Sequence, residues 1–434
     1  MNQLVDLTPA TDSPLQTAAP TEAPKGPAAE KRFKILHFLP DNQAWGGIEF
    51  YLKATLSAMA AHPDWGNRFE LVAAVTEGGR LAEQLKNSAV TVRLLPVHIK
   101  TPLVRVLDYR VLQALLVILK EERPDLVHIH KGRVEQSMIR MAGYPLMMTY
   151  HSYGGPNNLE NTPNAFLRSL YAATTPLLRG LTPFLETMLV VSDYERQRLY
   201  RENFIPKAFE AQVLYNGIPT DDLLKTTAGL DKQAFREALS IPEGARVVSF
   251  ICRLAPDKNA LAFLRIAKAV FEQTSQAVYF LVAGQGPDAQ LFEAAFAPGG
   301  TLHNAGQYLG FRSDVPKLLA ISDFTVSTSC QEGFGLRVLE SLLFGCPCLT
   351  YAAGGIPEVM SLPEAKDWLI PVGDETQFVA ALLQALAIPA AKREALAAVL
   401  QAHARTFDSQ HHINKLGKIY TNVLSKLQVN NFQA

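Results

Sequence analysis

From Phe33 onward, short apolar runs alternate with helix-length amphipathic stretches, and this alternation is the feature that most restricts how the chain can fold. The apolar runs are flanked by turn residues, as strands are, and the stretches between them are long enough for crossover helices. Such a pattern is typical of parallel sheets covered by helices. We therefore predict an α/β fold.

The apolar runs fall into two series, which indicates two domains. The expected strands of the first series are residues 34–39, 70–75, 126–130, 146–151 and 188–191, and those of the second are 247–252, 278–283, 324–327 and 348–351. The expected helices of the first half follow Gly47 and cover 111–120 and 194–200. Between the series, residues 216–245 lose strand character and are rich in glycine and proline. A chain of 434 residues also exceeds the roughly 250–300 residues that one core supports.

The predicted organisation has four parts. Residues 31–217 form a first Rossmann-like domain and residues 218–408 a second. Residues 1–30 are rich in Pro, Thr and Ala and have little to bury, so we expect a disordered tail. Residues 409–434 are expected to form a last helix.

Composition excludes several classes of protein. Lys and Arg number 41 and are balanced by 41 Asp and Glu, so the basic surface of a nucleic-acid-binding protein is not expected. The four cysteines are too few and too clustered for a disulfide framework. No apolar stretch is long enough to span a bilayer, and the first 24 residues lack the features of a secretory signal. We expect a cytoplasmic protein.

The segment 97–120 allows two interpretations. It combines four basic residues with a broad apolar face, which is typical of a helix lying on an anionic membrane surface. A core helix whose basic residues are solvated is the favoured interpretation.

A glycine-rich turn in the second half carries the sharpest chemical signal. An expected strand ends near Ser329, the residues CQEGFG follow, and LRVLESLLFG reads as a helix. Such a turn lies at the carboxyl edge of a parallel sheet, where free backbone N–H groups face a ligand. Glu332 and Glu340 both lie within reach of this edge, and carboxylates accept hydrogen bonds from sugar hydroxyls. Each also has a structural interpretation, as a first-turn charge and a solvated helix position.

Two cations are expected at the same edge. Arg253 ends the strand RVVSFIC, and Lys258 opens the next helix behind an Asp257 cap. An Arg fork and a Lys charge together suit a diphosphate. The stretch VAGQGPDA matches a dinucleotide pattern, but it follows the second strand of its domain and lacks the required acidic residue, so we interpret it as a turn.

Together these residues resemble the donor domain of glycosyltransferase family 4, which contains retaining nucleotide-sugar transferases of the GT-B fold. The motifs that carry the resemblance are RLAPDK at 253–258, GQGP at 284–287, YLGFRSDV at 308–315, EGFGLRVLE at 332–340 and GGIPE at 354–358. The first domain is similar through GGIE at 46–49, DLVHIH at 125–130, TYHS at 149–152, VSDYERQRL at 191–199 and YNGI at 215–218. The resemblance implies two doubly wound domains facing a central cleft, with the last helix packed on the first domain.

The resemblance also implies a role for particular residues. Arg253 and Lys258 would hold the diphosphate, and Glu340 the ribose hydroxyls. Glu332 and the backbone of Gly333, Phe334, Gly335 and Leu336 would hold the donor sugar, with base contacts from Gly310, Phe311 and Arg312, and with Gly47 and His151 contributed by the first domain. His130 is expected to be structural. Cys252 departs from the family, which usually has glycine before the arginine.

The implied reaction moves a hexosyl unit from a nucleotide-diphosphate sugar to an acceptor hydroxyl with retention, in glycan, polysaccharide or glycolipid biosynthesis. No two aspartates are separated by a single residue, so the D-x-D metal site of the other large transferase fold is missing and no metal or cofactor is expected. His151, Arg253, Lys258 and Glu332 are the expected catalytic residues. Two alternatives remain, a nucleotide-sugar epimerase and an inactive nucleotide-sugar-binding homologue. Peripheral contact of the first domain with the inner face of a membrane is also compatible with the sequence.

Overall fold

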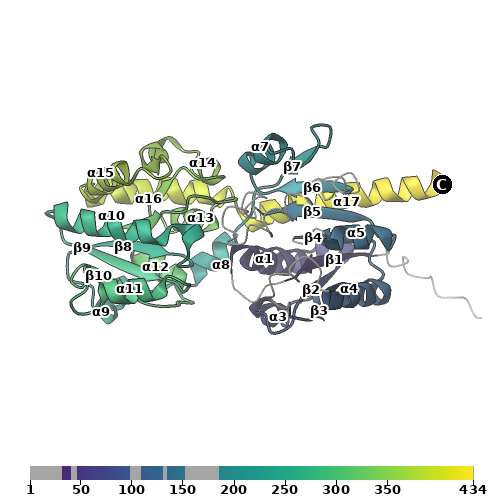
Figure 1. Ribbon diagram of the computed structural model, residues 1–434, viewed down its shortest axis with the longest axis horizontal. Helices are drawn as coiled ribbons and strands as arrows, with labels where there is room; N and C mark the ends of the chain where they lie inside the picture. The colour runs from purple at the N-terminus through teal and green to yellow at the C-terminus, as the bar shows by residue number, and fades with distance from the viewer. Residues whose placement is uncertain (1–31, 41–45, 98–108, 131–133, 152–184, 434) are drawn as a thin grey trace, which may run out of the picture.

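The computed structural model describes residues 32–40, 46–97, 109–130, 134–151 and 185–433. These residues form two parallel-sheet units that lie side by side along the longest axis of the molecule (Figure 1). The expected disordered tail lies outside the described residues.

The first sheet has the strand order β3-β2-β1-β4-β5-β6-β7 among the described residues, and neighbouring strands are parallel. Its strands are β1 (Phe33–Leu39), β2 (Phe69–Thr76), β3 (Thr91–Leu95), β4 (Leu126–Ile129), β5 (Leu146–Tyr150), β6 (Thr187–Val190) and β7 (Ala211–Val213). Its helices are α1 (Gly47–Ala61), α2 (Trp65–Arg68), α3 (Arg80–Leu85), α4 (Tyr109–Glu122), α5 (Val134–Met141) and α7 (Asp193–Arg201).

Alternate residues of each strand point to opposite sides of this sheet, and helices bury both sides. On β1, Ile35 and Leu39 join a core cluster with residues of α1 and of the last helix, α17 (Ser409–Gln433). Leu36 and Phe38 join a second cluster with residues of α4, α5 and α7. Burial on both faces explains why the strands read as continuous apolar runs.

The second sheet has the order β10-β9-β8-β11-β12-β13, again with parallel neighbours. Its strands are β8 (Arg246–Ile251), β9 (Val278–Ala283), β10 (Gly306–Tyr308), β11 (Phe324–Ser327), β12 (Cys348–Tyr351) and β13 (Leu369–Ile370). Its helices are α8 (Thr220–Lys225), α9 (Lys232–Ala238), α10 (Ala260–Gln273), α11 (Ala289–Phe296), α12 (Val315–Ile321), α13 (Leu336–Leu343), α14 (Ile356–Val359), α15 (Glu375–Leu386) and α16 (Ala390–Arg405), with short 3₁₀ turns at Pro256–Lys258 and Pro363–Trp368.

The chain passes between the two units twice at one place. Ile218 forms a parallel bridge with Asp408, and the backbone N–H of Ser409 donates to the Ile218 carbonyl over 2.8 Å. From there α17 runs along the first unit (Figure 1), where Ile413 and Leu416 are fully buried against α1 and β1. The last helix thus completes the core of the first sheet.

The predicted α/β architecture of two parallel sheets is confirmed. Strands β3, β7, β10 and β13 were not expected, and each lies at or next to a sheet edge. β3 is only partly buried, and the other three have two or three residues, so none produces a distinct apolar run. One expectation was wrong: Lys258 does not open a helix behind an Asp257 cap, because residues 256–258 form a 3₁₀ turn and α10 begins two residues later, after a left-handed Asn259.

The segment 97–120 supplies a core helix. Residues 98–108 lie outside the described part of the chain, and α4 buries Val111, Leu115 and Leu119 against the first sheet. The same helix leaves Leu116 and Val117 exposed. Among the described helices, none has both the length and the apolar character needed to cross a membrane.

Candidate active site

The EGFG turn connects the carboxyl end of β11 to α13, as the sequence predicts. Gly335 precedes the first helical residue with φ of +102°, a backbone conformation that favours glycine. Gly354 of the GGIPE segment packs against this turn so closely that a Cβ there would lie 1.7 Å from the Glu332 carbonyl oxygen. The N–H of Gly355 donates to that same carbonyl over 3.0 Å. The two motifs therefore form one rigid unit.

Lys258 and Glu332 meet at this turn although they are far apart in sequence. The Lys258 ammonium donates to a Glu332 carboxylate oxygen over 2.5 Å, and both side chains are about three-quarters buried. Burial by itself would lower the pKa of Lys258, but the Glu332 carboxylate outweighs it and the pKa is raised. Lys258 therefore stays protonated next to the Glu332 carboxylate.

Arg253 follows β8 at the same edge but has a different partner. Its guanidinium donates to Asp257 over 2.7 Å, and both side chains are more than half exposed. The Arg253 side chain is thus accessible to solvent at this edge. Burial raises the pKa of the preceding Cys252 thiol to about 12, which favours the neutral thiol over the thiolate.

Glu340 and Phe334 are both buried. Glu340 lies on α13 and is paired with Arg337, a residue that the sequence analysis did not select. Burial raises the pKa of Glu340 even though Arg337 opposes the shift. Phe334 stacks on Tyr215 with ring centres 5.6 Å apart, and so ties the EGFG turn to the segment that joins the two domains.

Gly310, Phe311 and Arg312 follow β10. The Arg312 guanidinium donates to both carboxylate oxygens of Asp314, over 2.8 and 2.6 Å. Burial opposes ionisation of Asp314, but the arginine outweighs it and lowers the pKa of that carboxyl. The Arg312 side chain is therefore engaged, and the Gly310 carbonyl accepts from the Gly284 N–H over 2.8 Å.

The carboxyl edges of the two sheets are in contact around these groups. Gly47 begins α1, and a Cβ on it would lie 3.7 Å from Leu336. The Ser192 hydroxyl donates to the Gly333 carbonyl over 2.7 Å. The Arg80 guanidinium lies 4.6 Å from the centre of the Phe311 ring. The structure thus brings Gly47 together with the turn residues.

Three cross-domain contacts were missed at the sequence level. Besides Ser192 and Arg80, Glu358 of the GGIPE segment accepts from the N–H groups of Asp193 and Tyr194, both over 2.7 Å. These N–H groups open α7, so an acidic residue of one domain caps a helix of the other. Glu358 is visible in the sequence as the last residue of the GGIPE motif, but its partners depend on how the two domains dock.

His151 lies next to β5 and is 8% exposed. Its Nε2 contacts His130 Nδ1 at 3.0 Å, and its ring lies 4.9 Å from that of Tyr51. Burial lowers the pKa of His151 to about 3, with His412 contributing, so the imidazole is neutral at physiological pH. His130, expected to be structural, is completely buried.

His37, His128 and His130 place ring nitrogens within 4.8 Å of one another, inside the first domain. Among the described residues this is the one set of three potential metal ligands. The sequence analysis did not select His37 or His128.

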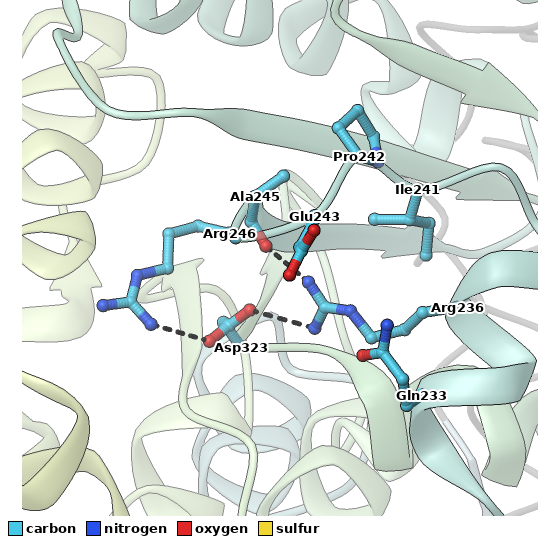
Figure 2. A pocket seen from close by; sticks show the side chains of 9 residues that line it. Gln233, Arg236, Ile241, Pro242, Glu243, Ala245, Arg246 and Asp323 are labelled. Carbon is cyan, nitrogen blue, oxygen red and sulfur yellow. Dashed lines mark hydrogen bonds and ion pairs between the residues drawn. The ribbon is translucent and has the colours of Figure 1, made fainter.

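A pocket of about 240 Å³ lies at the opposite, amino edge of the second sheet. Figure 2 shows the Arg236 and Arg246 guanidinium groups pointing at Asp323, which lies 3.7 and 3.4 Å from them. Arg393 also pairs with this carboxylate at 3.0 Å. The cluster joins α9 and α16 to the start of β8 and β11, and we assign it to stability.

Two parallel-sheet domains that meet at their carboxyl edges have the GT-B fold. Residues 45–222 match the family model described as Glycosyltransferase Family 4, and residues 231–400 match Glycosyl transferases group 1. The chain belongs to glycosyltransferase family 4.

Two curated relatives are similar over much of the chain. One is the UDP-Gal:α-D-GlcNAc-diphosphoundecaprenol α-1,3-galactosyltransferase of Escherichia coli, 26% identical over 64% of this chain and 70% of its own. The other is the 2-deoxystreptamine N-acetyl-D-glucosaminyltransferase of Streptomyces fradiae, 25% identical over 63% of this chain and 65% of its own. The matches thus span about two thirds of each relative.

Solved structures share the fold. HepE of Anabaena in complex with UDP has a TM-score of 0.70 at 20% identity, covering 90% of this chain and 100% of its own. A sucrose-phosphate synthase of Thermosynechococcus elongatus has a TM-score of 0.72 at 16% identity, covering 91% and 100%.

Proposed function

We propose that this glycosyltransferase moves a hexosyl unit from a nucleotide-diphosphate sugar to an acceptor hydroxyl with retention of configuration. The observation that carries the proposal is the Lys258–Glu332 pair at the EGFG turn, opposite Gly47 of the other domain. The turn offers a charge for a leaving diphosphate and a carboxylate for a sugar hydroxyl at one place.

In this proposal the ligand lies along the edge of the second sheet. Lys258 and Arg253 hold the diphosphate, and Arg253 exchanges Asp257 for phosphate oxygens when the donor binds. Glu332 and the backbone of the following turn hold the sugar. Glu340 accepts from the ribose hydroxyls, and the backbone of residues 310–312 contacts the base.

The cations stabilise the negative charge that develops on the diphosphate as the glycosidic bond breaks. The acceptor hydroxyl attacks the same face of the sugar that the diphosphate leaves and gives its proton to the leaving phosphate. No protein nucleophile is assigned. His151 is neutral and hydrogen-bonds the sugar rather than acting as a base.

The experiment that tests this function is a panel of nucleotide sugars, with thermal stability and nucleotide release as readouts. A UDP-sugar is the first donor to test, because the HepE structure contains UDP. The correct donor raises the melting temperature by mass action and is consumed in the presence of a lipid-linked glycan acceptor. An α-linked product from an α-linked donor supports retention, whereas a β-linked anomeric coupling in the NMR spectrum contradicts it.

We also expect turnover without a divalent metal. Arg253 and Lys258 supply the positive charge that Mg²⁺ or Mn²⁺ would otherwise provide to a diphosphate. Initial rates in EDTA should therefore equal those in buffer alone. A rate abolished by EDTA and restored by either ion would contradict the expectation.

We further propose that the first domain docks on an anionic membrane surface through the outer face of α4. Tyr109, Leu116 and Val117 share one face of the helix, at positions i, i+7 and i+8, and are 65%, 39% and 54% exposed, with Lys120 next to them. Apolar side chains of this kind insert at the headgroup boundary while basic ones contact anionic lipids. In this proposal the enzyme acts at the inner membrane face, where a lipid-linked acceptor is accessible.

Val117→Glu is expected to weaken binding to anionic vesicles by about tenfold, since it replaces apolar contact with a repelled charge. Vesicle co-sedimentation measures the change. Val399→Glu on α16 is the matched control, because Val399 is 41% exposed on the second domain. Equal losses in the two variants would refute docking through α4.

A further inference from the structure

A continuous chain of hydrogen-bonded side chains crosses the core of the first domain and ends at His151. In order, its members are Thr149, His128, Tyr420, His37, His130 and His151. The successive distances are 2.7, 2.7, 3.2, 3.0 and 3.0 Å. All of these residues except His151 are at most 2% exposed.

Strand periodicity explains how these groups meet. His128 and His130 are two residues apart at β4, as are Thr149 and His151 at β5, so each pair lies on one face of the sheet. His37 of β1 is in register with His128. Tyr420 comes from α17, which covers that face, and supplies the link between His128 and His37.

At any moment, all hydrogen bonds in this chain of side chains are donated in the same direction. A neutral imidazole has one N–H and one bare nitrogen, so each internal histidine donates one hydrogen bond and accepts the other. Fixing the donor at one end therefore fixes the tautomer of every ring up to His151. In one direction His151 carries its proton on Nδ1, and in the other on Nε2.

The end at Thr149 decides between the two directions. The Thr149 hydroxyl contacts His128 Nε2, and we find no other partner for it among the described residues. If His128 donated to Thr149, the buried hydroxyl hydrogen would be left without an acceptor, which is unfavourable. Thr149 therefore donates, and each following group donates toward His151.

We propose that this chain holds His151 as the neutral tautomer protonated on Nδ1. Its Nε2 accepts from His130, so Nδ1 is the nitrogen left for a ligand, and His151 is the member with residual exposure. A fixed N–H donor there suits an oxygen of the donor sugar, and this part of the inference rests on the proposed function. Thr149, His128, Tyr420, His37 and His130 are then positioning residues.

A metal ion on His37, His128 and His130 would be a competing explanation for the cluster. Although one ring nitrogen of each lies within 4.8 Å of the others, both ring nitrogens of His37 and of His130 already face a hydrogen-bonding neighbour. Every one of these contacts also has the length of an ordinary hydrogen bond. Stoichiometric metal in the purified protein, lost on His37→Gln, would overturn the proposal.

The ¹⁵N resonances of the histidine side chains test the tautomer directly in the full-length protein. A protonated and a bare ring nitrogen differ widely in ¹⁵N shift, so wild-type His151 should show a protonated Nδ1 and a bare Nε2. Tyr420→Phe removes the central hydroxyl and leaves His37, His130 and His151 without a fixed direction. The two His151 shifts should then move toward each other, and kcat should fall about twofold to tenfold with little change in donor KM.

Tyr51→Phe is the matched control. Tyr51 is as buried as Tyr420 and its hydroxyl also contacts a histidine, His412 Nε2 at 3.1 Å, but it lies outside the chain. This variant keeps the ring beside His151 and should retain the wild-type shifts. A protonated Nε2 in wild-type His151, or unchanged shifts in Tyr420→Phe, would overturn the proposal.

A second pair of variants tests the end of the chain. Thr149→Val keeps the shape but removes the donor, and should give mixed tautomers at His151, whereas Thr149→Ser should restore the wild-type shifts. Wild-type shifts in Thr149→Val would refute the assigned direction. The spectra do not depend on turnover, so absence of transferase activity with every donor would refute the proposed function and leave this test intact.

Discussion

Replacing Lys258 with alanine is expected to lower kcat by about 100-fold to 1,000-fold, the usual effect of removing one preorganised electrostatic contact. The ammonium lies at the turn where the diphosphate is proposed to leave, and the diphosphate gains negative charge in the transition state. The loss should therefore appear mainly in kcat, with a smaller change in donor KM. Steady-state kinetics with the identified donor measure both.

Lys268→Ala is the control for this prediction. Lys268 lies on α10, is half exposed and pairs with Glu272 at 3.8 Å, away from the turn. It should keep wild-type kinetics, and both variants should keep a cooperative melting transition. A Lys258→Ala enzyme with normal kcat and only a raised donor KM would show that Lys258 binds the ground state alone.

Glu332→Gln is expected to lower kcat by about 10-fold to 100-fold. The substitution keeps the side-chain shape and one acceptor oxygen but removes the charge that pairs with Lys258. Hydrogen bonds to charged groups contribute about 1.5–3 kcal/mol, which corresponds to this range of rates if the contact to the sugar strengthens in the transition state. Single-turnover rates separate this chemical step from product release.

Glu375→Gln provides a comparable carboxylate without a role at the site. Glu375 pairs with Arg265 on the second domain at 2.5 Å and is one-third exposed. It should transfer sugar at the wild-type rate. Wild-type kinetics in Glu332→Gln as well would remove Glu332 from the catalytic residues.

The sequence predicted the central strands of both sheets because burial on both faces makes them continuous apolar runs. Residues 34–39 were expected as a strand, and β1 covers Phe33–Leu39. The edge strand β3 was not predicted, because its residues are only partly buried and its sequence is therefore less apolar. The 3₁₀ turn at Pro256–Lys258 was not predicted either, because an acidic residue before a helix is typical of a helix cap. In the structure Asp257 instead pairs with Arg253.

By itself the sequence determined the family, the glycine-rich turn and the residue types at the carboxyl edge of the second sheet, because these depend on local conformation and short spacing. Only the tertiary structure decided the partners. Lys258 pairs with Glu332, and Tyr420 enters the histidine chain between His128 and His37, because separate strands and α17 bring them together. Such pairings depend on sheet register and on how the last helix packs, neither of which has a local signal.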